Sequence, residues 1–77
     1  MTSVDVTTSW TQLSVGNCAV KNWGTDKIWV GFGATAPTLT YEKCFELPGN
    51  SQEAYAMDTG VWAIVPSGSV TVTVQDF

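Results

Sequence analysis

The chain has no histidine and no arginine, and its three lysines stand against seven acidic residues, which gives a net charge of −4. Without a basic surface it has little with which to neutralise phosphates or read base edges, so we expect no nucleic-acid partner. With neither histidine nor arginine, the pairing of a nucleophile with a base that hydrolases and transferases use is absent. We therefore expect the protein not to be an enzyme.

Charged residues are also scarce, at 13% of the 77 residues against 44% hydrophobic residues. This composition is typical of a folded chain and not of a disordered tail. A chain of this length supports one domain, residues 1–77, with a marginal core that usually needs a staple or a neighbour. No stretch approaches the roughly 20 apolar residues of a membrane span, and the first residues do not resemble a signal peptide. We expect a soluble protein, made in the cytoplasm, with no membrane partner.

Cysteine is limited to Cys18 and Cys44. The pair could form one disulfide, but nothing in the sequence indicates export and a reducing cytosol disfavours the bond, so we expect free thiols. Two thiols without histidine do not complete a zinc site. We expect no metal and no cofactor.

Carboxylates are the remaining candidates for chemistry. Glu42 and Glu46 alternate onto one face of an expected strand and could act as an acid and base pair. Asp26, Glu53 and Asp58 lie in or near expected turns, although no acidic run resembles a calcium loop. A solvated strand face and ordinary turn chemistry account for all five residues, and we favour that interpretation.

What the chain has throughout is alternation of apolar and polar residues between clusters of Gly, Pro, Asn and Asp, which is typical of half-buried strands. Residues 70–75 are the clearest strand, with three valines on one face. Residues 61–65 form a continuous apolar run, and we expect these two strands to pair as a hairpin. Residues 18–23 and 27–34 flank a short turn and are expected to form a second hairpin.

The middle of the chain continues the pattern. Tyr41, Phe45 and Leu47 are expected to point inward from one strand, which a turn at residues 47–50 ends. A short strand near residues 53–57 follows. We expect an all-β fold, namely a small single-domain antiparallel β-sandwich or barrel of six or seven short strands. Residues 1–9 are either its first strand or a flexible arm that a partner orders.

The four tryptophans are the most informative residues, because a domain this small can hardly bury them all. Trp62 lies in the most apolar run and is expected in the core, whereas Trp10 and Trp23 lie near the arm and a turn. We take Trp10 and Trp23, together with Val4 and Val6 of the arm, as interface candidates, because tryptophan is enriched at binding hot spots. Half-buried packing in a monomer explains the tryptophans equally well.

Trp29 shares an expected strand face with two glycines, Gly31 and Gly33. Glycines in this position leave room for an aromatic ring from a neighbouring strand to lie over the backbone. A phosphate-binding loop would need a third glycine and a following helix, which the sequence does not provide. We therefore interpret the glycines as packing residues.

From about Cys18 onward, turn and core residues follow a recurring pattern. It consists of Asn22 before a turn, an apolar strand at residues 28–30, a Leu-Pro-Gly turn from Leu47, a Gly-Val-Trp-Ala segment at residues 60–63 and a final valine strand. The pattern resembles small β-sandwich accessory virion proteins of tailed bacteriophages, which serve as capsid decoration proteins, head-fibre bases or tail accessory proteins. The resemblance implies a structural virion protein and no catalytic residues.

The expected function is therefore that of a capsid decoration (cement) or head or tail accessory subunit of a bacteriophage virion. Its expected partners are copies of itself, in an oligomer such as a trimer, and a major capsid or tail protein. Docking would also stabilise a marginal core, because it acts only on the folded chain. The competing expectation is a module that presents tryptophans to a glycan for host recognition.

Overall fold

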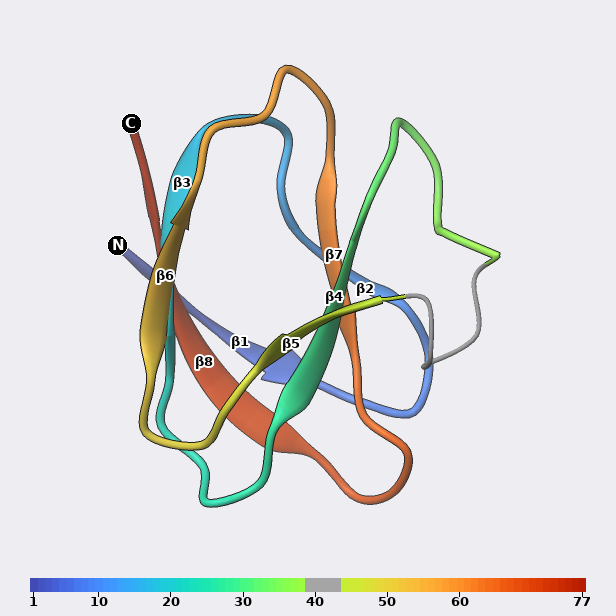
Figure 1. Cartoon of the computed structure of the whole chain (residues 1–77), viewed down its shortest axis with the longest axis vertical. Coiled ribbons are helices and arrows are strands. Elements are labelled where there is room, and N and C mark those ends of the chain that lie inside the picture. Colours follow the sequence, from blue (N-terminus) through green and yellow to red (C-terminus); the bar gives the residue numbers. More distant parts are fainter. Residues whose placement is uncertain (39–43) are drawn as a thin grey trace.

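The computed structural model describes residues 1–38 and 44–77, which form eight β-strands (Figure 1). The strands are β1 (Thr2–Val6), β2 (Thr11–Ser14), β3 (Cys18–Asn22), β4 (Ile28–Phe32), β5 (Phe45–Leu47), β6 (Gln52–Tyr55), β7 (Val61–Ile64) and β8 (Val70–Asp76). Within these residues there is no helix long and apolar enough to cross a membrane.

The strands form two four-stranded sheets, with the order β1-β8-β3-β6 in sheet A and β2-β7-β4-β5 in sheet B. All neighbouring strands are antiparallel. The two sheets lie face to face as separate layers (Figure 1). The expected all-β antiparallel sandwich is confirmed, with eight strands in place of six or seven. The connectivity is that of a jelly roll, in which the chain passes back and forth between two sheets.

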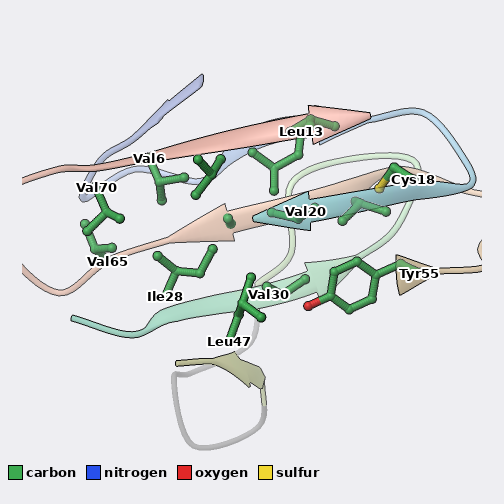
Figure 2. Packing of buried hydrophobic residues seen from close by; sticks show 14 residues of the cluster. Val6, Leu13, Cys18, Val20, Ile28, Val30, Leu47, Tyr55, Val65 and Val70 are labelled. Carbon is green, nitrogen blue, oxygen red and sulfur yellow. The ribbon is translucent and has the colours of Figure 1, made fainter. Parts of the chain in front are cut away.

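The core fills the space between the sheets with aliphatic side chains (Figure 2). Val72 and Val20 from sheet A meet Ile28, Val30 and other residues from sheet B, and all four of these are almost fully buried. The alternation expected for the last strand is confirmed, because Val70, Val72 and Val74 are buried while Thr71 and Gln75 are exposed.

Both hairpins expected from the sequence are wrong. β7 pairs with β2 and β4 in sheet B, whereas β8 pairs with β1 and β3 in sheet A. In the same way β3 and β4 belong to opposite sheets. The short segments after β3 and β7 cross from one layer to the other, so that each strand presents its apolar face to the same core without pairing with its neighbour in sequence.

A buried asparagine ties the crossing after β3 to the turn after β5. The amide nitrogen of Asn22, which is 0% exposed, donates to the carbonyl oxygens of Asp26 (2.9 Å), Leu47 (3.2 Å) and Pro48 (3.2 Å), and its side-chain oxygen accepts from the Gly24 amide (2.9 Å). A buried polar side chain is tolerated only when it is hydrogen-bonded, so this network fixes the ends of both sheets relative to each other.

The turn expected at residues 47–50 lies one residue later, at 48–51, and an asparagine takes the positive φ there. Asn50 has a φ of 59°, and the Ser51 amide donates to the Pro48 carbonyl (3.2 Å). A side chain at Gly49 would collide with the backbone of Thr25, so the turn packs directly on the crossing after β3. Leu47 is buried as expected, but Phe45 is 64% exposed because it lies on a three-residue edge strand. Tyr41 and Glu42 lie outside the described residues.

The first strand settles the alternative between a strand and an arm for most of residues 1–9. Residues 2–6 form β1 and pair one-to-one with β8, from Thr2 opposite Val74 to Val6 opposite Val70. Val6 is fully buried in the core between the sheets. Val4 faces the same way and packs against that core while remaining partly exposed.

Candidate interaction surface

The outer face of sheet B carries aromatic side chains. Cross-strand partners in a sheet point to the same side, and the register places Trp29 opposite Ile64 and Gly31 opposite Trp62. Their neighbours Val30 and Ala63 are buried in the core, so these four residues face away from it. Trp62 was expected in the core, and that expectation is wrong. Only one side of the apolar run of β7 packs against the other sheet, and Trp62 on the opposite side is half-buried.

A third tryptophan completes this face. A side chain at Gly31 would lie 3.2 Å from Cη2 of Trp10 and 2.8 Å from Cγ of Pro37. Both groups therefore lie directly over the Gly31 backbone, which confirms that a glycine here makes room for a ring. We call the resulting surface the tryptophan face. It consists of Trp10, Trp29, Gly31, Pro37, Trp62 and Ile64.

Polar contacts fix two of its rings. The indole nitrogen of Trp62 donates to the Gly33 carbonyl (2.9 Å). The ammonium group of Lys27 lies 5.3 Å from the centre of the Trp29 ring and 2.7 Å from a carboxylate oxygen of Glu46. A cation above an indole and an acid beside it form a polar rim around the apolar surface. Glu46, a candidate acid from the sequence, is therefore an exposed partner of a lysine.

Burial on this face is incomplete. Trp10, Trp29 and Trp62 are each half-buried. Ile64 is only 8% exposed, yet it is outside the cluster that fills the space between the sheets. Trp29 also lines a hollow of about 500 Å³ next to the turn at residues 66–69. The face is thus an apolar layer with one side still open to solvent.

The outer face of sheet A is different in composition. Trp23 is 61% exposed, and its indole nitrogen donates to the hydroxyl of Thr73 (2.6 Å). The ammonium group of Lys21 lies 5.3 Å from the centre of the Trp23 ring. Beside it is a shallow hollow of about 360 Å³ with both apolar and polar side chains. It is lined by Met1, Ala19, Val20, Lys21, Gln52, Glu53, Ala54, Thr73 and Gln75.

The structure separates the four interface candidates. Trp10 lies on the tryptophan face of sheet B, and Trp23 lies on the opposite side of the molecule over sheet A. One flat contact cannot include both rings. Val4 lies on an edge strand and is partly exposed, whereas Val6 is fully buried and belongs to the core, so it is not part of an exposed surface. The sequence did not single out Trp29 as an interface candidate; its shared face with Gly31 was the available signal.

One polar cluster brings together a hydroxyl, a carboxylate and a thiol. Ser14 donates to Asp76 (2.5 Å) and interacts with Cys18. Burial raises the pKa of the Cys18 thiol, which disfavours the thiolate that a nucleophile needs. Burial also raises the pKa of Tyr55 to about 12, with smaller contributions from Glu53 and Cys18. The cluster joins β2 of sheet B to β8 and β3 of sheet A and serves as a structural contact.

Both cysteines are free thiols. Among the described residues, no three acidic or cysteine side chains gather closely enough to hold a metal ion. No protein-family model matches the chain, and neither does any curated protein or solved structure.

Proposed function

We propose that the chain is a structural virion protein of a tailed bacteriophage, a capsid decoration or head or tail accessory subunit that docks through its tryptophan face. The observation that carries this proposal is the gathering of Trp10, Trp29 and Trp62 on one outer face that is half open to solvent. The jelly roll recurs in viral capsid domains, but it also recurs in lectins, so the fold supports the proposal only by analogy.

The chemistry of the face fits a protein partner. Tryptophan contributes more than most residues to protein–protein interfaces when its ring becomes fully buried, and a polar rim is typical around such a centre. The ring of Trp62 is already held by its hydrogen bond to Gly33, so less conformational freedom is lost on binding.

Docking would also increase the stability of the folded protein. A 77-residue domain buries a limited fraction of its surface, and a partner that binds only the folded state adds its binding free energy to folding. In a decoration protein that free energy is itself the function, because it ties neighbouring subunits of the shell together. We take the protein to be non-enzymatic and located in the virion, where a major capsid or tail protein is its partner.

The test is co-sedimentation of the purified chain with phage particles that lack it. Trp10→Ala and Trp29→Ala should each weaken binding by about thirty-fold, equivalent to about 2 kcal/mol for an interface tryptophan. Trp23→Ala is the matched control, because it removes the same side chain from the opposite sheet. Circular dichroism should show the same β fold for all three variants. Equal losses for the three, or no binding by the parent chain, would exclude this surface.

The second candidate, a glycan-binding module, is favoured by one observation on sheet A. Trp23 is held in place by Thr73 next to a hollow whose lining includes Lys21, Gln52 and Gln75, and an aromatic ring beside hydrogen-bonding groups is suited to a sugar. Titration with glycans should then shift tryptophan fluorescence in the parent chain and not in Trp23→Ala. A monomer that binds sugars and ignores particles would favour this function over the structural one.

A further inference from the structure

Each sheet has two edge strands, and three of the four carry features that discourage pairing with another strand. β2 is interrupted by an irregularity between Gln12 and Ser14, and β5 is only three residues long. On β6, Glu53 is the cross-strand partner of the buried Val20, so a charged side chain sits on the inward side of that edge. These features are common protections against edge-to-edge association.

β1 has none of these protections. It is five residues long, its register with β8 is uninterrupted, and it contains neither proline nor lysine. No described strand lies on its other side. An edge of this kind presents a row of backbone groups that another strand can pair with. Asp5 is its one charged residue and faces outward with Ser3, because Val4 and Val6 face the core.

We propose that β1 pairs antiparallel with β1 of a second copy, about a two-fold axis at Val4, so that sheet A becomes a continuous eight-stranded sheet. This is the register that pairs all five residues of β1. It places Val4 opposite the partner's Val4, Ser3 opposite the partner's Asp5 and Thr2 opposite the partner's Val6. The inference goes beyond the proposed docking and specifies the symmetry and the strand of the oligomer expected from the sequence.

The side chains of β1 are complementary to themselves in this register. On the outer face a serine hydroxyl can donate to the facing carboxylate, twice because of the symmetry. On the inner face the partly exposed Val4 would meet its own copy and lose its remaining exposure. Moving the axis to Asp5 would place two carboxylates directly opposite each other, which is unfavourable. A shift that mismatches the faces would put the two cores on opposite sides of the sheet.

The first test uses charge at Ser3, which is exposed. Ser3→Asp would place a carboxylate opposite the partner's Asp5, and Ser3→Lys would place an ammonium group there. With two such contacts per dimer, we expect dimerisation about ten-fold weaker for Ser3→Asp and about ten-fold tighter for Ser3→Lys. Ala54→Asp and Ala54→Lys, on the other edge strand of sheet A, are the matched controls and should leave the dimer unchanged. Sedimentation equilibrium of the full chain measures all four constants.

The second test reports the position of the axis. In a Cys44→Ser background, Val4→Cys would bring the two new thiols within about 5 Å between α-carbons, which is within range of a disulfide. Thr2→Cys should not cross-link, because each residue advances about 3.4 Å and the two copies of residue 2 would lie well over 10 Å apart. Non-reducing electrophoresis after mild oxidation distinguishes the two variants.

A chain that stays monomeric to high concentration, or a dimer that neither responds to the sign of the charge at Ser3 nor cross-links through Val4→Cys, would overturn the pairing. Particle binding is measured separately from dimerisation, by co-sedimentation. If the dimer forms as described but the chain does not co-sediment with particles, the strand pairing stands and the virion function fails. Ser3→Asp should still co-sediment if only the tryptophan face docks.

Discussion

The protein has two apolar layers that differ in composition. The layer between the sheets consists mainly of valine, leucine and isoleucine, together with one fully hydrogen-bonded asparagine. The tryptophan face over sheet B has three indole rings, a proline and one isoleucine, and it remains open on one side. Small aliphatic residues pack a thin sandwich without gaps, whereas the large rings are placed where a partner could still cover them. The first layer stabilises the fold, and the second remains partly open to solvent.

The difference is tested most strongly by placing the same charge in both layers. Val72 is 0% exposed on an inner strand of sheet A, so Val72→Asp or Val72→Lys should unfold the domain or make it insoluble, because an unpaired charge there costs several kcal/mol. Trp29→Lys places an ammonium group on the half-open face, where the long side chain can reach water, and should remain folded. Thermal denaturation followed by circular dichroism compares them. A folded Val72→Asp with an unchanged melting temperature would contradict the inward orientation of this residue.

The second-largest effect is expected at the joint between the sheets. Asn22→Ala removes four side-chain hydrogen bonds and leaves the Leu47 carbonyl and the Gly24 amide without this partner, so it should cost about 3 kcal/mol of unfolding free energy. Asn17→Ala changes the same residue type at an exposed position and should cost less than about 0.5 kcal/mol. Urea denaturation measures both. Similar values for the two would show that the network does not hold the crossings together.

Apart from β2, strand positions could be read from the sequence, and so could the facing of β8, but strand partners could not. The valines of β8 and the apolar run of β7 were located because alternation with a period of two depends only on which side faces a core. The same pattern is satisfied whether the next strand pairs beside it or crosses to the opposite sheet. A five-residue connection permits either arrangement, and the long-range partners β1 and β2 decide between them.

The tryptophan face could be predicted only in part from the sequence, for a related reason. Trp10 is remote in sequence from Gly31, yet its ring lies over that glycine. The glycine beside a tryptophan did predict that a ring would lie there, but not which one. Trp62 was assigned to the core because hydrophobicity alone does not distinguish the space between two sheets from the outer face of one sheet.

The pH dependence of the unfolding free energy tests the burial of Tyr55 in the layer between the sheets without a substitution there. The pKa of Tyr55 is raised from 10 to about 12, chiefly by burial. Below pH 10 both the folded and the unfolded chain hold this proton. Between about pH 10 and 12 only the folded state keeps it, so stability should fall as pH rises, by up to about 1.4 kcal/mol per pH unit. Tyr55→Phe should lack this part of the decline. Parallel slopes for the two proteins in urea denaturation would exclude a buried phenol.

The smallest effects are expected at the two thiols, which also lie in different surroundings. Cys18 is 0% exposed between the sheets, and Cys44 is half-buried next to the edge strand β5. A buried free cysteine packs as a small hydrophobic residue, so Cys18→Ala should cost about 1 kcal/mol and Cys44→Ala less, with the fold retained in both. The sequence favoured free thiols, and both are free in the structure. Intact mass measured without reductant provides the check on purified protein. A mass lower by two hydrogens would reveal a bond between them, and both variants would then lose similar, larger amounts of stability because either substitution breaks the same link.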